Sequence, residues 1–258
     1  MTSQTDRQRF LIETLKQEEE SWRGIKIPDR KEEQKRLLRS LMNLRPPRPV
    51  SAEFLAVQDA YLQEEQRRKG IVDWKDLSPV QPGIYLWQGD ITRLRADAVV
   101  NAANSALLGC FVPCHGCIDN AIHWAAGVQL RLECARIMEG QRAEEPTGRA
   151  KITKAYNLPC RYVLHTVGPI ISGSVTPKDC ELLAGCYRSC LELAEEYRLE
   201  SIAFCCISTG EFHFPNKLAA DIAVKTVKSW QKEHKQSPEV IFNVFKDKDY
   251  GIYQQLLQ

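Results

Sequence analysis

The pattern of apolar and polar positions divides the chain into two unlike parts. Up to about residue 73, apolar residues recur at helical spacing in three stretches, which Gly24 to Pro28 and the prolines at 46, 47 and 49 separate. Ser51 is placed to cap the third stretch and Gly70 to end it. We therefore expect a helical extension over residues 1–73, whose apolar faces are Phe10, Leu11 and Leu15, then Leu37, Leu38, Leu41 and Leu44, then Phe54, Leu55, Tyr61 and Leu62.

From about Trp74 the pattern changes to short apolar, β-branched runs that alternate with helical segments. This alternation predicts an α/β domain over residues 74–258 with a largely parallel sheet. The expected helices cover residues 119–138, 180–197 and 216–232. The expected strands are 84–87, 98–100, 152–155, 162–166, 202–207 and 240–245.

Ligands of such sheets bind beyond the carboxyl ends of the strands, where loops lead into helices. The rule selects the loops at 89–91, 101–120 and 208–215. The last of these has small residues, and its successive N–H groups could hold a phosphate. Its spacing matches neither the P-loop nor the dinucleotide fingerprint, so an ordinary connection between a strand and a helix is an equally good interpretation.

Composition narrows the class of protein further. Of 258 residues, 43% are hydrophobic and 26% are charged, which excludes a disordered or collagen-like chain. The 35 basic and 33 acidic residues argue against nucleic-acid binding through bulk charge. The sequence contains no run of about 18 apolar residues that would suggest a membrane span. The first nine residues lack the apolar stretch of a secretory signal. We expect a cytoplasmic monomer.

The cysteines bring in the first candidate chemistry. There are ten, all after residue 109, and in a cytoplasmic chain they are thiols, metal ligands or a nucleophile. Those at 134, 186, 190, 205 and 206 are interpreted as small buried side chains. Cys110, Cys114, His115 and Cys117 instead form a compact set of soft donors.

Three interpretations of this cluster stay open. Zinc held by Cys110, His115 and Cys117 would leave an open position, as catalytic zinc sites do, although Cys114 could close the shell. The alternatives are a redox pair of Cys114 and Cys117, and buried thiols without a metal. A zinc deaminase is excluded because it needs a His-x-Glu upstream, and all five histidines follow Pro113.

Several segments in combination resemble the macrodomains that bind ADP-ribose. The similarity runs from about residue 74 to the C-terminus, and the thiol-rich stretch 109–117 replaces the glycines usual in that family. The chain is therefore most similar to the zinc-dependent macrodomains of microbial protein-ADP-ribose hydrolases, which also carry a helical N-terminal extension. The segments are Gly89-Asp90-Ile91-Thr92, residues 97–104, Asp119 to His123, Ala125-Ala126-Gly127, His165 to Pro169 and Ile207 to Gly210.

The resemblance implies a three-layer α/β/α macrodomain and a hydrolase that releases mono-ADP-ribose from a modified protein side chain. It implies one Zn²⁺ ion per chain on Cys110, His115 and Cys117. The implied substrate is a lipoyl carrier like the glycine-cleavage H protein, ADP-ribose is the product, and the subfamily is functionally linked to a class M sirtuin. The rival interpretations are a non-catalytic ADP-ribose reader with structural zinc and a deacylase of O-acyl-ADP-ribose.

The resemblance also assigns roles to individual residues. Asp90 accepts a hydrogen bond from the adenine amino group, with Ile91 beside it. Asn104 and Asp119 are the expected catalytic residues and orient the distal ribose or a water. Zinc would bind a ribose hydroxyl or activate water. The remaining expected ligand-binding residues are Cys117 and Ile118, followed by the diphosphate loop Ser208, Thr209, Gly210, Glu211 and Phe212.

Overall fold

The computed structural model describes residues 3–258 and begins with four helices. These are α1 (Gln4–Glu18), α2 (Glu20–Arg23), α3 (Lys31–Leu44) and α4 (Ala52–Lys69). Ser51 caps α4 as expected, because its Oγ accepts a hydrogen bond from the Phe54 amide at 3.1 Å. Gly70 ends that helix with a positive φ of 79°. The expected helical N-terminus is confirmed, whereas a domain boundary at residue 73 stays a prediction.

The centre of the molecule is a six-stranded sheet in the order β2-β8-β7-β4-β6-β5. All neighbouring strands run parallel except β5, which pairs antiparallel with β6 at the sheet edge. A separate two-stranded parallel pair joins β1 (Val72–Asp73) to β3 (Leu94–Arg95). The six strands are β2 (Ile84–Gln88), β4 (Ala98–Ala102), β5 (Ala150–Lys154), β6 (Tyr162–Thr166), β7 (Ser201–Phe204) and β8 (Glu239–Val244).

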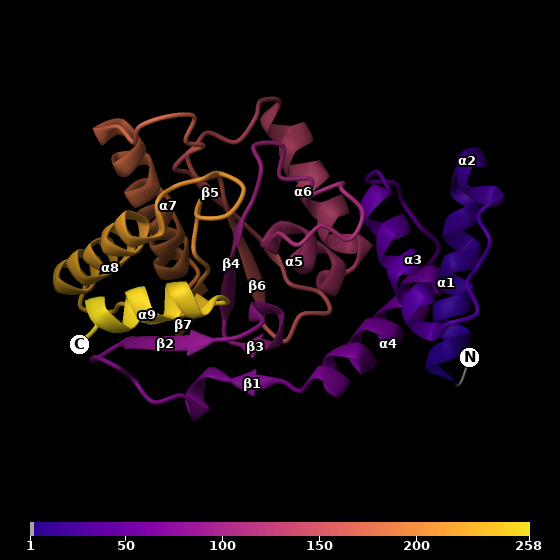
Figure 1. Cartoon of the computed structure of the whole chain (residues 1–258), viewed down its shortest axis with the longest axis horizontal. Helices are drawn as coiled ribbons and strands as arrows, with labels where there is room; N and C mark the ends of the chain where they lie inside the picture. Colours follow the sequence, from indigo (N-terminus) through magenta and orange to yellow (C-terminus); the bar gives the residue numbers. More distant parts are fainter. Residues whose placement is uncertain (1–2) are drawn as a thin grey trace.

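Helices cover both faces of this sheet (Figure 1). One face carries α7 (Pro177–Glu196), α8 (Asn216–Glu233) and α9 (Asp247–Leu256), and the other carries α5 (Ile118–Ala126) and α6 (Val128–Gln141). The four N-terminal helices lie outside α5 and α6, at the opposite end of the molecule from α7–α9. The expected α/β fold with a mixed, mostly parallel sheet is confirmed.

Besides the short elements α2, β1 and β3, which were not expected, two longer elements differ from the expectation. The helix expected over 119–138 is two helices, because Gly127 between them has a φ of 93° that a residue with a side chain rarely adopts. A Cβ there would also lie 2.7 Å from Nε2 of Gln58 on α4. The C-terminal helix α9 was not expected, although it covers the sheet beside α8.

The N-terminal helices share a hydrophobic core with the α/β part. Leu11, Leu38 and Phe54 are fully buried in that core, which also contains Trp124 of α5 and Val128 of α6. The amide of Val128 donates to the Gln58 side chain at 2.9 Å. The extension is thus packed directly on the two helices that follow the cysteine-rich loop. Within residues 3–258, no helix combines the length and apolarity that crossing a bilayer needs.

Candidate functional site

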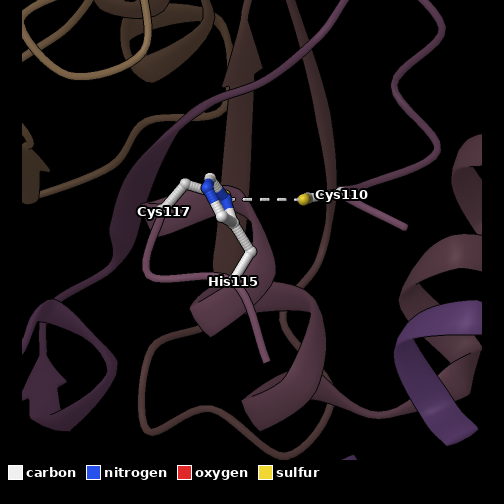
Figure 2. Close-up of side chains that lie close together, drawn as sticks. All are labelled: Cys110, His115 and Cys117. Carbon is white, nitrogen blue, oxygen red and sulfur yellow. Dashed lines mark hydrogen bonds between the residues drawn. The ribbon is translucent and has the colours of Figure 1, made fainter. Parts of the chain in front are cut away.

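Three predicted metal ligands converge between β4 and α5. The ligand atoms of Cys110, His115 and Cys117 all lie within 4.8 Å of one another, and all three side chains are half-buried. Nδ1 of His115 is 3.7 Å from Sγ of Cys110, and Figure 2 shows the imidazole and the two cysteines around one point. Two thiols and an imidazole in this arrangement form a donor set that suits Zn²⁺.

Cys117 lies at the start of α5, in an environment that disfavours its thiolate form. It is the N-cap residue, and its sulfur accepts a hydrogen bond from the Asn120 amide at 3.4 Å. Burial raises the pKa of Cys117 to about 12, the Asn120 amide opposes this, and the neighbouring Cys110 adds to the rise. A cation between the two sulfurs would relieve this repulsion, so the residues present fit a metal ion.

The backbone conformation of Gly109 sets the direction in which the chain enters Cys110. Its φ is 79°, and a Cβ at this position would lie 2.8 Å from the ring of His123 on α5. A side chain is therefore excluded both by the backbone conformation and by the close ring. The approach places Cys110 next to the beginning of α5, where the other two ligands are.

Cys114 lies outside this group. Its thiol faces α3 instead, 3.3 Å from Oγ of Ser40 and 3.4 Å from the carbonyl oxygen of Arg36. Its φ of 52° is in the left-handed region, which turns this residue away from its neighbours in the loop. The geometry brings together three of the four soft donors between 110 and 117 and separates the fourth.

Asp119 is buried beneath the metal ligands at the start of α5. Its Oδ1 accepts a hydrogen bond from Nδ2 of Asn101 at 2.8 Å and lies 3.5 Å from Nε2 of His123. Burial raises the pKa of Asp119 to about 6, while the Asn101 hydrogen bond and then the charge of Arg131 lower it. Asn101, the last but one residue of β4, therefore fixes the carboxylate that the sequence singled out.

Asn104 lies in the loop that carries the metal ligands, and its side chain makes no hydrogen bond with Asp119. Its Nδ2 donates to the carbonyl of Gly109 at 3.1 Å. Its Oδ1 is buried and has no hydrogen-bond partner among residues 3–258. A buried amide oxygen without a partner carries a desolvation cost, which a bound hydroxyl would remove.

Asp90 and Ile91 lie beyond the end of β2, where a short turn begins. Oδ1 of Asp90 accepts from the Thr92 amide at 3.0 Å and from the Thr92 hydroxyl at 2.7 Å, and Lys69 of α4 is 3.4 Å from Oδ2. Burial alone would raise the pKa of Asp90, but the Thr92 hydrogen bonds and Lys69 outweigh it and lower the value. The carboxylate is half-exposed and Ile91 is buried beside it.

The loop after β7 offers polar groups that nothing in the described chain uses. The amides of Gly210, Glu211 and Phe212 donate to no acceptor within residues 3–258. Ser208 has a φ of 63° and a buried Oγ that also lacks a partner there, whereas the Thr209 hydroxyl donates to the Cys206 carbonyl at 3.0 Å. Free amides in a row form an anion-binding concavity.

This loop reaches the metal-ligand loop through Glu211. Oε1 of Glu211 is 3.8 Å from Nε2 of His115, on the ring nitrogen that does not face Cys110. The sequence placed both residues in the site but did not predict that they meet. His123 and His165 are both buried.

A family model for the Macro domain matches residues 100–223. A protein-ADP-ribose hydrolase of Treponema medium is 57% identical over 99% of both chains. The chain belongs to the macrodomain family. A protein-ADP-ribose hydrolase of Staphylococcus aureus (strain MSSA476) is 49% identical, over 99% of this chain and 96% of that protein.

Solved macrodomains agree with the fold. The Oceanobacillus iheyensis macrodomain with ADP is 42% identical over 67% of this chain and 88% of its own, with a TM-score of 0.61. The Trypanosoma brucei macrodomain in complex with ADP-ribose is 33% identical over 85% of this chain and 95% of its own, with a TM-score of 0.67. The expected macrodomain fold is confirmed, and the relatives' names bear out the expected hydrolase of ADP-ribosyl linkages.

Proposed function

We propose that this macrodomain is a zinc-dependent hydrolase that removes mono-ADP-ribose from a modified protein side chain. The observation that carries the proposal is the meeting of two loops. One presents Cys110, His115 and Cys117, and the other presents free amides, with the contact between His115 and Glu211 joining them. The relatives named protein-ADP-ribose hydrolase, similar over nearly the whole chain, support the same function.

Binding of ADP-ribose would extend from Asp90 to the ligand loop. The lowered pKa of Asp90 keeps its carboxylate charged, which makes it a stronger acceptor for the adenine amino group. The amides of Gly210 to Phe212 and the unpartnered Ser208 hydroxyl would hold the diphosphate. The near-neutral net charge of +2 means that these local donors, rather than a basic surface, compensate the anion.

Cys110, His115 and Cys117 would hold the metal at the distal ribose. Zn²⁺ bound there would supply Lewis-acid chemistry to a substrate or water oxygen. The unpartnered Oδ1 of Asn104 would accept a hydrogen bond from a ribose hydroxyl, and Asp119 would orient the attacking water. Hydrolysis breaks the bond between the anomeric carbon and the protein side chain. The water adds its hydroxyl to that carbon and its proton goes to the departing side chain.

The substrate we propose is a lipoyl carrier similar to the glycine-cleavage H protein, modified by a class M sirtuin. This assignment rests on the subfamily resemblance of residues 74–258. The enzyme would act in the cytoplasm, where the sirtuin and the carrier would also be found.

One experiment tests the proposal as a whole. Zinc in the purified protein is quantified, and release of ADP-ribose from a sirtuin-modified carrier is followed before and after chelation. We expect about one zinc per chain and loss of release on chelation that added Zn²⁺ restores. Release that continues at the same rate in metal-free, folded protein would exclude catalytic zinc. Tight ADP-ribose binding without any release would identify a reader, and release from O-acetyl-ADP-ribose alone would identify a deacylase.

A further inference from the structure

Helix α3 of the N-terminal extension is bonded to the loop that carries the metal ligands. Nη2 of Arg39 donates to Oδ1 of Asn120 at 2.6 Å and to the carbonyl oxygen of His115 at 3.2 Å. Nε of Arg39 donates to the same Asn120 oxygen at 3.1 Å. One guanidinium group thus holds both the backbone of a ligand and the first turn of α5, using the planar fork that arginine provides.

Asn120 extends this connection to the other side of the loop. It is fully buried, and its Nδ2 donates to the carbonyl oxygen of Val112 at 2.9 Å. Its backbone amide donates to Sγ of Cys117. Arg39 and Asn120 together therefore bond the loop at residues 112, 115 and 117, which brackets two of the three ligands.

A second contact from α3 fixes the residue between these points. Oδ1 of Asn43, a side chain that is 1% exposed, accepts a hydrogen bond from the Cys114 amide at 2.9 Å. Cys114 has the left-handed φ of 52°, a conformation that costs about 1 kcal/mol or more for a residue with a Cβ. The Asn43 hydrogen bond stabilises this conformation, and it directs the Cys114 thiol toward α3.

We propose that Arg39 and Asn43 are positioning residues of the metal site. They hold the loop at residues 112–117 so that Cys110, His115 and Cys117 converge while Cys114 stays apart. The inference rests on the proposed zinc dependence. It adds that helix α3 holds the three ligands in place before the metal binds. A ligand set held in place before the metal arrives loses less conformational entropy on binding, so the contacts from α3 raise metal affinity.

The test is the zinc affinity of full-length Arg39→Ala, measured by competition with a chelator at a temperature where circular dichroism shows folded protein. Losing such a supporting contact weakens metal binding by about 10- to 100-fold, and we expect a loss in this range. Arg36→Ala is the matched control. Arg36 stands one turn earlier on α3 with an exposed side chain that makes no hydrogen bond within the described residues, and we expect its zinc affinity to stay within about twofold of the parent protein.

A second variant and two further readouts separate positioning from general stability. Asn43→Ala should also weaken zinc binding, and both variants should change the visible spectrum of the Co²⁺-substituted protein, because the ligand geometry relaxes. ADP-ribose affinity of the metal-free variants should be unchanged. Parental zinc affinity and Co²⁺ spectra in both Arg39→Ala and Asn43→Ala would overturn this inference alone. A parent protein that binds no zinc would overturn the proposed function and this inference together.

Discussion

Nε2 of His115 lies 3.8 Å from Oε1 of Glu211, although the two residues are 96 positions apart in the chain. The other ring nitrogen, Nδ1, faces Cys110. A histidine that binds a metal through one nitrogen commonly donates from the other to a carboxylate, which fixes the ring and strengthens the ligand. The contact therefore couples the proposed metal site to the proposed diphosphate loop.

Replacing Glu211 tests this coupling. Glu211→Ala should weaken zinc binding by less than about tenfold, because a contact of 3.8 Å from a largely exposed carboxylate is weaker than the hydrogen-bonded partners whose loss costs about 10- to 100-fold. Glu211→Gln keeps an oxygen acceptor and should lose less. The measurement is chelator competition, with Glu139→Ala, a change at an exposed residue of α6, as the control. Equal zinc affinities for all three variants would show that the carboxylate does not support His115.

The separation of Cys114 from the other ligands predicts unequal effects of two serine substitutions. Cys114→Ser should retain about one zinc per chain, because its thiol faces Ser40 rather than the ligand group. Cys117→Ser should lose most of the zinc, because a thiolate ligand is replaced by a hydroxyl that stays protonated. Metal quantification after gel filtration checks both. Loss of zinc from Cys114→Ser alone would make Cys114 a ligand and the site a closed one.

Ser208 provides a test of the diphosphate loop. Its Oγ is buried and makes no hydrogen bond within the described part of the chain, so Ser208→Ala removes no internal hydrogen bond and should leave the unfolding free energy about the same. If this hydroxyl binds phosphate, the Kd for ADP-ribose should rise about 10- to 150-fold, since a hydrogen bond to a charged group contributes about 1.5–3 kcal/mol. Calorimetric titration checks the affinity. Thr209→Ala, which removes the bond to Cys206, should instead lower stability.

Replacing Asp90 tests whether this residue recognises the adenine. Asp90→Ala should weaken ADP-ribose binding by about tenfold or more, because a charge-assisted hydrogen bond is lost. The same change removes the acceptor for Thr92, so a loss of about 1 kcal/mol in stability is expected and is measured separately by urea unfolding. An ADP-ribose affinity equal to that of the parent protein would move the adenine away from this residue.

The buried His165 predicts a pH dependence of stability. Burial lowers the pKa of His165 to about 3, against an ordinary value of 6.5 in the unfolded chain. Its ring faces Asn101, Thr153 and Cys134, and the His123 ring lies 6.0 Å away. Between pH 6.5 and 3 the unfolded state binds more protons, so the stability present above pH 6.5 falls as the pH decreases, by up to about 1.4 kcal/mol per pH unit.

Urea unfolding of metal-free protein at several pH values between 7.5 and 5 measures this slope. His165→Gln should be less stable at pH 7.5 but should lose less stability on acidification. His123, whose pKa burial also lowers, stays in both proteins and keeps part of the slope. Identical slopes for the parent and the variant would show that His165 does not take up the proton on unfolding.

Local patterns in the sequence determined much of the fold and the identity of the ligands. The strand at Tyr162–Thr166 and the helix that Ser51 and Gly70 bound were predicted correctly, because alternation and capping depend on adjacent residues. The soft donors at 110, 115 and 117 were visible because they stand within eight positions. Gly127 could have indicated the break between α5 and α6, since a glycine inside a helical pattern weakens it.

Tertiary structure decided which of these residues act together. Only the fold shows that Cys114 is drawn toward α3, because the hydrogen bond from its amide to Asn43 spans 71 positions. The contact of Arg39 with His115 and that of Glu211 with the same residue also join distant segments. Neither contact can be read from periodicity or residue spacing, because an exposed arginine and an arginine that hydrogen-bonds a distant loop look the same in the sequence. The chain sequence determined the donors, and long-range packing determined their arrangement.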